Sequence, residues 1–501
     1  MTFDRILKSA AALLWLPIIS YAADGVDYTK GVFIVNEDWY GHQNSTVNYL
    51  LPDDPDGNWW HYRVIQTENP GMELGCTNQY GAIWNGRFYF IAKQAKDPGA
   101  SVTGGRISVA DASSMKLIKQ LELIDPSGAQ CDGRAFVGVT DTKGYVSSSN
   151  GVWILDLDAI EITGQVEGTS NPNVGSGNDA SASNPGSSLY FGQTGCMQLA
   201  EGMVFAAHQQ YGVLVIDPAV DKVVKVIDMT IVDDAVERDT GTRPSKPSGV
   251  GSSIVRSKDG ALWVNVAKDV QGTGDAQPYL VRIDPTTLEA EVVAVNGDGV
   301  YPPSNSWYAW TPDPFCASSV TNSLYWCGGV NSWFTKNCIF RFDTNTRTVD
   351  KVVDLASESG NWSVYGASLG IHPETDELYA SLFHGFQDNS YIVRRFAADG
   401  TPLRDYPMIS NYWFPSMPVF PQSSTAGIDA AVAVADVSVT VSSHSIAVSG
   451  APGCEMCVYN MQGQCVYRAA VISDSEWFEP QLTPGFYIVR VGTHSAKFHL
   501  N

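Results

Sequence analysis

The side chains best suited to bind a ligand are aromatic and polar residues that fall in predicted loops between apolar strands. Aromatic rings stack on flat molecules and imidazoles form hydrogen bonds, so this set suits a bulky, uncharged ligand. Packing beneath the loops is the alternative, which we expect for about half of them. The candidate ligand-binding residues are Trp39, Tyr40, His42, His208, Gln209, Tyr211, Trp307, Trp310, Trp333, Trp362, His384, Phe386 and Trp413.

No pattern of catalytic residues accompanies these side chains. The sequence has no nucleophile elbow, His-Glu-x-x-His motif, P-loop or dinucleotide fingerprint. His42, His208 and His384 occupy similar loop positions, so a shared metal is the alternative to three solvated histidines. Residues 53–58 have oxygen ligands at calcium-like spacing but no bidentate glutamate follows, which favours a turn. We therefore predict no catalytic residue, no metal and no cofactor.

Composition excludes several classes of partner. The 501 residues carry 31 Lys and Arg against 53 Asp and Glu, a net charge of -22. Nucleic acids and anionic membranes require clustered cations, so neither is an expected partner, and the acidic surface disfavours anionic ligands. With 44% hydrophobic and 17% charged residues the chain is too apolar to be disordered, and 46 Gly with 26 Pro indicate many turns.

The first segment predicts export. Residues 1–22 contain Arg5 and Lys8, an apolar run over residues 10–19, and a small-x-small site at Ser20 to Ala22. The run is shorter than the about 20 residues that span a bilayer, so we interpret it as a signal peptide. No later segment reaches membrane-spanning length, and no cysteine near the cleavage site suggests a lipid anchor. Nine cysteines in an exported chain allow disulfides and leave at least one thiol unpaired.

The strongest signal is an internal repeat of apolar segments that end on aspartate. Each is followed by a polar turn and a second apolar run, which predicts a strand, a turn and another strand. Degenerate copies at residues 45–50 and 391–396 bring the count to seven. The five clear copies are residues 106–111, 151–156, 212–217, 279–284 and 338–343.

A hairpin precedes each of these segments. Its turns at Asn85-Gly86, Glu201-Gly202 and Asp259-Gly260 are of the two-residue type. Two hairpins per unit, repeated seven times, predict an all-β fold: a seven-bladed β-propeller over residues 23–421. Two stacked β-sandwiches are the alternative. The first unit begins with its second strand, so we expect residues 413–421 to supply the missing strand and close the ring.

Long loops and a tail complete the domain organisation. The loops at residues 169–192 and 232–251 exceed an ordinary blade connection and are either lids or disordered insertions. Residues 422–437 have the composition of a linker, and residues 438–501 form a small C-terminal β-sandwich module. Cys454 and Cys457 have the spacing of a redox motif, but no βαβ pattern surrounds them.

Two parts of the sequence resemble known families. The segment Lys30–Glu37, the Asp-ended strands and the segment Tyr365–Tyr379 resemble the YncE-like seven-bladed propellers, more narrowly their exported versions from Gram-negative gut anaerobes. This resemblance covers residues 30–421. The hairpin at residues 458–467 and the Leu-x-x-Gly-x-Tyr motif from Leu482 resemble the C-terminal sorting domain of type IX secretion. A generic Ig-like accessory module is the alternative for the tail.

These resemblances imply a function. Some YncE-like relatives capture cobalamin at the cell surface for a TonB-dependent outer-membrane transporter, and others have no assigned ligand. We therefore expect a monomeric, non-catalytic protein at the outer-membrane surface or outside the cell that captures a bulky nutrient, first of all a corrinoid. The alternatives are a glycan-binding protein, a protein-interaction or adhesion scaffold, and a propeller lyase or lactonase. The last would need histidines and carboxylates that converge on the channel.

Overall fold

The computed structural model describes most of the chain. The described residues are 26–171, 192–245, 247–267, 278–297, 299–300, 303, 314–328, 335–422, 438–441, 445–449, 454–460, 465–473, 475–480, 482–491 and 494–500. The predicted signal peptide and nearly all of the predicted linker lie outside them, as do Trp307, Trp310 and Trp333.

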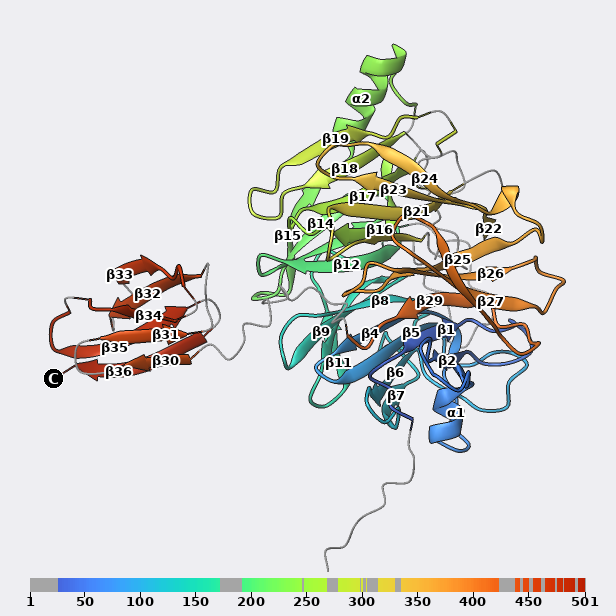
Figure 1. Cartoon of the computed structure of the whole chain (residues 1–501), viewed down its shortest axis with the longest axis horizontal. Helices are drawn as coiled ribbons and strands as arrows, with labels where there is room; N and C mark the ends of the chain where they lie inside the picture. Colours follow the sequence, from blue (N-terminus) through green and yellow to red (C-terminus); the bar gives the residue numbers. More distant parts are fainter. Residues whose placement is uncertain are drawn as a thin grey trace, which may run out of the picture.

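The described part of residues 32–419 forms seven antiparallel sheets in succession (Figure 1). Six have four strands and one has five, a repeated architecture like that of a β-propeller. The first sheet contains β29 (Pro415–Val419), β1 (Val32–Asn36), β2 (Thr46–Leu50) and β3 (Trp60–His61); the second contains β4 (Cys76–Trp84), β5 (Arg87–Gln94), β6 (Ile107–Asp111) and β7 (Leu117–Leu121); the third contains β8 (Gly133–Gly138), β9 (Lys143–Ser148), β10 (Gly151–Asp156) and β11 (Glu161–Gln165). The fourth sheet contains β12 (Thr194–Ala200), β13 (Met203–His208), β14 (Gly212–Asp217) and β15 (Lys222–Ile227); the fifth contains β16 (Gly249–Arg256), β17 (Leu262–Ala267), β18 (Tyr279–Ile283) and β19 (Ala290–Ala294). The sixth sheet contains β20 (Phe315–Ala317), β21 (Ser323–Gly328), β23 (Cys338–Asp343) and β24 (Val349–Asp354); the last contains β22 (Thr335–Lys336), β25 (Ser363–Ile371), β26 (Leu378–Phe383), β27 (Tyr391–Phe396) and β28 (Pro402–Pro407).

Two of the three predicted two-residue turns have the expected backbone. Asn85 and Gly86 join β4 to β5 with φ of 48° and 71°, and Glu201 and Gly202 join β12 to β13 with φ of 49° and 74°. Positive φ at both positions is the backbone of a type I′ turn, whose twist matches that of the flanking strands. These hairpins therefore follow from local sequence.

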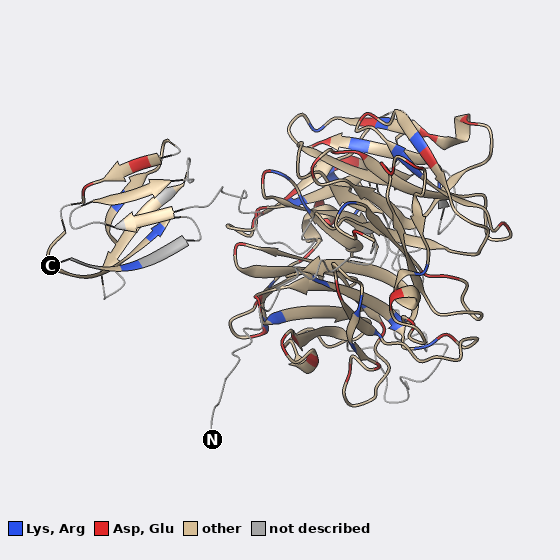
Figure 2. Ribbon diagram, turned by 60° about the horizontal axis from the view of Figure 1, so that its bottom comes forward, with Lys and Arg blue, Asp and Glu red and all other residues tan. Residues whose placement is uncertain are grey.

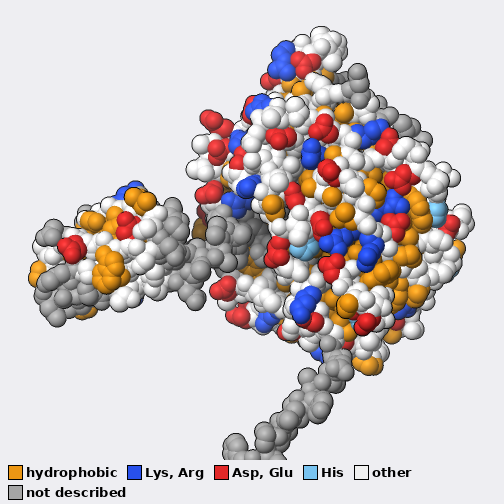
Figure 3. Space-filling model, viewed as in Figure 1, with side chains coloured by type: hydrophobic (Ala, Val, Ile, Leu, Met, Phe, Trp, Pro, Cys, Tyr) orange, Lys and Arg blue, Asp and Glu red, His pale blue; other side chains and the backbone are white. Residues whose placement is uncertain are grey.

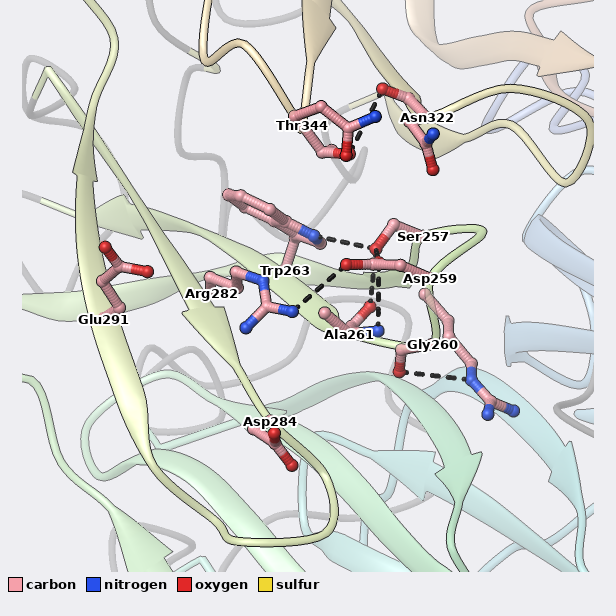
Figure 4. Close-up of polar contacts among 12 residues, drawn as sticks. Ser257, Asp259, Gly260, Ala261, Trp263, Arg282, Asp284, Glu291, Asn322 and Thr344 are labelled. Carbon is pink, nitrogen blue, oxygen red and sulfur yellow. Dashed lines mark hydrogen bonds and ion pairs between the residues drawn. The ribbon is translucent and has the colours of Figure 1, made fainter.

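The third predicted turn, Asp259-Gly260, is wrong as a two-residue hairpin. Arg256 pairs with Leu262, so the loop spans residues 257–261, and the Ser257 amide donates to the Ala261 carbonyl at 2.9 Å. The Asp259 carboxylate accepts a hydrogen bond from Arg282 at 3.1 Å across the sheet (Figure 4). Asp259 therefore belongs to a five-residue loop, and Arg282 of the neighbouring strand holds its side chain.

The repeated aspartates hold turns at the ends of the third strands. Asp111 Oδ1 accepts hydrogen bonds from the amides of Ser113 and Ser114, at 3.1 and 2.9 Å. Asp343 Oδ1 accepts from the amides two and three residues further on, at 2.9 and 2.8 Å. Asp284, visible in Figure 4, accepts the same pair of bonds at 2.8 and 3.0 Å. The repeat therefore encodes side-chain-capped turns.

The hydrophobic core lies between successive sheets. Tyr89 of β5 stacks on Phe136 of β8 with ring centroids 4.1 Å apart. Gly138 of β8 lies directly against Trp84 of β4, where an added Cβ would be 2.1 Å from the indole ring. Glycine is thus required at this position because it lets the large ring of the neighbouring sheet pack against the backbone.

The first sheet is built from both ends of the repeated region. β29 pairs antiparallel with β1, and Phe33 is opposite Val419. Ser416 Oγ donates to the Val35 carbonyl at 3.1 Å and to the Asn78 carbonyl at 2.9 Å. A strand from the end of the region therefore covers the edge of β1 that would otherwise be unpaired.

Four short elements were not anticipated. Helix α1 (Val64–Glu68) follows β3, and helix α2 (Thr230–Thr240) ends at Gly241, whose φ is 74°. α2 occupies the start of the long 232–251 loop, so that segment contains ordered helix. The two-residue strand β22 pairs with β25 and gives the last sheet its fifth strand. A 3₁₀ turn, η2 (Leu355–Ser357), follows β24.

The C-terminal region has two further sheets. The first contains β30 (Ser438–Val441), β31 (Ile446–Ser449) and β34 (Ser475–Phe478); the second contains β33 (Cys465–Ala470), β32 (Glu455–Asn460), β35 (Gly485–Val491) and β36 (His494–Leu500). Ile446, Val448, Met456, Val458 and Val489 are buried together, so this module has a core of its own.

Charge is distributed over the surface without a basic patch in the views shown. Asp and Glu occur at many of the turns (Figure 2), and Lys and Arg are interspersed with them on the face in Figure 3. Among the described residues, no helix is long and apolar enough to cross a membrane. No disulfide joins any of the nine cysteines, all of which are described.

Candidate functional site

An exposed aromatic group forms where the first and last sheets meet. We define the aromatic surface as Trp39, His42, Phe386 and Tyr412. Trp39 and His42 lie in the loop after β1, Phe386 in the loop after β26, and Tyr412 in the segment before β29. Trp39 is 41% exposed and Phe386 45% exposed. These rings therefore present area to solvent from three separate segments.

Ring contacts connect the members of this surface. Trp39 stacks on His42 with ring centroids 3.8 Å apart and lies 4.2 Å from Tyr412. Beneath them, the buried Phe414 ring is 6.3 Å from Tyr412 and 5.8 Å from Phe386. The segment before β29 therefore joins the two loops into one aromatic layer.

Buried polar contacts fix the loop that carries Trp39. Asp38 adopts a left-handed backbone with φ of 58°, and its Oδ2 accepts a hydrogen bond from Thr46 at 2.6 Å. The Gly41 amide donates to Asp97 Oδ2 at 2.8 Å, and Asp97 is fully buried. Burial raises the pKa of Asp38 to about 7. The loop is therefore held in one conformation before any ligand arrives.

Two other predicted residues form a separate pair. Trp362, half-buried before β25, lies with its ring centroid 3.6 Å from that of exposed His384 in the loop after β26. Both lie in loops next to strands of the last sheet, as does Phe386. The structure shows that Trp362 and His384 contact each other.

His208, Gln209 and Tyr211 are on another sheet, and two of them are buried. His208 Nδ1 accepts hydrogen bonds from the amides of Gln210 and Tyr211, at 3.2 and 3.1 Å. Burial lowers the pKa of His208 to about 4, so this imidazole is neutral at physiological pH. Gln209 Oε1 accepts from the Gly192 amide at 3.0 Å, while Tyr211 is exposed and stacked on His208.

Trp413 does not present its ring to solvent. It is 1% exposed, its Nε1 donates to the Ile409 carbonyl at 2.9 Å, and its ring stacks on Tyr62 with centroids 5.4 Å apart. The Arg63 guanidinium lies 5.6 Å from the ring centroid. Trp413 therefore anchors the segment that carries Tyr412 and does not itself offer a ligand-binding face.

A second group of functional interest is buried and ionisable. We define the buried ionic cluster as Glu37, Lys93, Arg106, Asp132 and Arg134. These residues come from the first three sheets, and Glu37, Lys93, Arg106 and Asp132 are each buried. No sequence pattern indicated this cluster, because its members are far apart in the chain and none belongs to a motif.

Hydrogen bonds satisfy part of this cluster. Glu37 Oε1 accepts from Gln79 Nε2 at 2.9 Å and its Oε2 accepts from the Tyr365 hydroxyl at 3.2 Å. Arg106 donates to the carbonyls of Lys93 and Glu122, at 2.9 and 2.8 Å. Glu37 and Arg106 are thus each held by two hydrogen bonds from or to other residues of the protein.

Burial shifts the pKa of several members. It raises the pKa of Glu37 to about 7 and raises that of Asp132, although nearby Arg134, Arg106 and Lys93 oppose the change in Asp132. It lowers the pKa of Lys93 well below the usual value, and neighbouring Arg134 lowers it further. Shifts of this kind mark candidate functional sites because the folded protein holds charge at a cost.

Tyr40 lies beside both groups. It follows Trp39 in the same loop and is 47% exposed. Partial burial raises the pKa of its hydroxyl, with contributions from Cys76, Asp97 and Asp132. Tyr40 therefore connects the loop that carries Trp39 to the surroundings of the buried ionic cluster.

Residues 53–58 contain the turn that the sequence predicts. Asp53 pairs with Arg395 at 2.8 Å, and Asp54 Oδ1 accepts from the amides of Asp56 and Asn58 at 3.0 Å each. No group of three or more His, Cys, Asp or Glu side chains in the described ranges could hold a metal ion. Residues 53–58 therefore form a turn that the Asp54 carboxylate holds.

Comparison with known proteins gives a family but no function. No curated protein matches the sequence. A chain of the mitotic checkpoint complex matches at 15% identity and a TM-score of 0.39, covering 68% of this chain and 82% of the other. The extracellular domain of a protein described as a hybrid two component system, BT3049 from B. thetaiotaomicron, matches at 12% identity and a TM-score of 0.33, covering 85% of this chain and 55% of the other. At these scores neither structure informs the fold or function.

The family model described as "Domain of unknown function (DUF5074)" matches residues 30–421, which span all seven sheets of the repeated region. Because this match covers most of the sequence, the chain belongs to the DUF5074 family.

Proposed function

We propose that this protein is an exported, seven-bladed β-propeller that captures a bulky, uncharged nutrient without chemical change. The fold part of the proposal is supported by contacts between the first strands of successive sheets. β29 contacts β4, β4 contacts β8, and the series continues through β12, β16, β20 and β25 back to β29. A closed series of this kind is expected of a ring of blades.

The aromatic surface is the observation that carries the ligand-binding part. Trp39, His42 and Phe386 are exposed. Partly buried Tyr412 contacts Trp39, and the rings of Tyr412 and Phe386 pack on buried Phe414. Grouping exposed aromatic rings costs free energy in water, and a stacking ligand removes that cost. The first ligand to test is a corrinoid, because the YncE-like resemblance implies one. Delivery to a TonB-dependent transporter at the outer membrane, with residues 1–22 and 438–501 as export and sorting signals, is part of the same proposal.

Calorimetric titration of the purified protein with cyanocobalamin and with cobinamide tests this function. We expect saturable binding that Trp39→Ala weakens by about tenfold, since loss of one stacked ring costs on the order of 1–3 kcal/mol in comparable sites. Trp477→Ala is the matched control because Trp477 is 70% exposed but belongs to the C-terminal module. Absence of heat with both corrinoids would exclude this ligand class, and a sugar array would then test the glycan alternative.

A further inference from the structure

Lys93 carries a buried amino group that lacks a hydrogen-bond partner among the described residues. It lies near the end of β5 and is 5% exposed, and its Nζ has no hydrogen-bond partner among the described residues. A buried ammonium group without an acceptor is strongly destabilising, so such groups are normally paired or neutral. An unpartnered amine in this position is therefore a candidate ligand contact.

The backbone brings a second cation to the same place. Gly133 begins β8 so close to β5 that an added Cβ would lie 2.7 Å from the Ala92 carbonyl oxygen. This approach places Asp132 and Arg134, the neighbours of Gly133, beside the end of β5. Arg134 has the largest charge interaction with Lys93 of any group. The basic side chains of Lys93 and Arg134 thus lie close together at the end of β5.

Lys93 and Arg134 lie among acceptors that differ in charge and in hydrogen bonding. Arg134 Nε donates to the neutral Gln193 Oε1 at 2.9 Å. Both carboxylate oxygens of Glu37 already accept hydrogen bonds from Gln79 and Tyr365. Asp132 is the remaining carboxylate of the cluster, and its Oδ1 has no hydrogen-bond partner in the described structure. The site therefore has an unused donor at Lys93 and an unused acceptor at Asp132.

We propose that Lys93 and Arg134 bind a small oxyanion, the carboxylate or phosphate group of a ligand that enters past Tyr40. An oxyanion would accept hydrogen bonds from the Lys93 ammonium and screen the repulsion between the two cations. A hydroxyl on the same ligand, or the protonated oxygen of a phosphate, would donate to Asp132 Oδ1. This site goes beyond the proposed capture of an uncharged ligand, which needs only the aromatic surface, and either can fail without the other.

Small anions test the site directly. The purified full-length protein is titrated calorimetrically with inorganic phosphate and with acetate, at constant ionic strength in a chloride buffer. We expect one-site binding of at least one anion, and Lys93→Met should weaken it by about tenfold or more, because hydrogen bonds to charged groups contribute about 1.5–3 kcal/mol. Lys96→Met is the matched control, because Lys96 is exposed and lies just beyond β5. Phosphate-only or acetate-only binding identifies the source of the oxyanion.

A second measurement keeps the test valid if Lys93→Met does not fold. Acylation of the wild-type lysines, quantified by mass spectrometry, should be slowed by the bound anion at Lys93 and unchanged at Lys96. If Lys93→Met and Lys96→Met bind the anion with equal affinity, the proposal is overturned. Absence of one-site binding by both anions, with no protection of Lys93, would overturn it as well.

Discussion

Carboxylates at the outer turns and carboxylates in the buried ionic cluster show opposite behaviour. Near solvent, hydrogen bonds from the Ser113 and Ser114 hydroxyls lower the pKa of Asp111, and a backbone hydrogen bond from Thr346 lowers that of Asp343. Glu37 and Asp132 are buried, and desolvation raises the pKa of each. The outer carboxylates stabilise the fold in their charged form, whereas the inner ones remain charged only at a cost.

The two regions also differ in how often they occur. The turn aspartate recurs at the end of third strands in successive sheets, so it reports on the repeated fold. The members of the buried ionic cluster come from the first three sheets and belong to no repeated motif, so they report on tertiary contacts between those sheets.

Removal of Asp132 should give the largest effect on stability. Asp132→Ala leaves Arg134, Arg106 and Lys93 without their adjacent carboxylate, and breaking a buried charge network from one side costs about 3–5 kcal/mol. Equilibrium unfolding in urea measures the change. A loss no larger than that of Asp111→Ala would remove the distinction between inner and outer carboxylates.

Glu37→Gln should change the pH dependence of stability. The pKa of Glu37 is about 7 in the folded protein and 4.5 in its unperturbed state, so the folded state binds the proton more tightly. Wild-type stability contributed by this group therefore falls as pH rises from about 4.5 to about 7, by about 3 kcal/mol in total.

The Glu37→Gln variant should lack that component of the slope when unfolding is followed between pH 4.5 and pH 8. Burial also raises the pKa of Asp38 to about 7, so the stability of the variant should still depend on pH in this range through Asp38. Glu122→Gln changes an exposed carboxyl and is the control. An unchanged slope in Glu37→Gln would show that Glu37 is not the buried acid that titrates in this range.

Removal of an outer turn aspartate should have a smaller effect of the opposite pH sign. Asp111→Ala loses the bonds to the amides of Ser113 and Ser114 and should destabilise by about 1 kcal/mol. Because hydrogen bonds lower the pKa of Asp111, its contribution is present at neutral pH and is lost as pH falls below about 4. Urea unfolding at pH 7 and pH 3 should show a smaller difference between the two proteins at pH 3 than at pH 7.

Trp39→Ala should also have a small effect on stability. Trp39 is 41% exposed but packs against His42 and Tyr412, so the free energy of unfolding should fall by about 1 kcal/mol even where ligand binding is weakened. Urea unfolding of this variant, set beside the ligand titrations, separates a binding role from a structural one. A large loss of stability would instead assign Trp39 to packing.

Local sequence patterns predicted strands and turns well, but they predicted the burial and the contacts of side chains poorly. Asn85-Gly86 was predictable because the φ values of a type I′ turn select those residues. The Asp259-Gly260 loop was not, since Arg282 from a later strand holds its carboxylate. Trp39 and Trp413 looked alike in sequence, yet one is exposed and the other stacks on Tyr62 in the interior. Burial depends on neighbours that are distant in the chain.

The sequence by itself determined the repeated antiparallel sheets and the capped turns, because strand alternation, positive-φ turn residues and turn-capping aspartates act within a few residues. Only the tertiary structure decided which aromatic side chains face solvent and that Lys93, Asp132 and Arg134 lie together. Close approach at Gly133 brings two sheets into contact, and the charges of one sheet then set the pKa of residues on the next. Such through-space effects have no signature in local sequence because the groups that interact are separated by long stretches of chain.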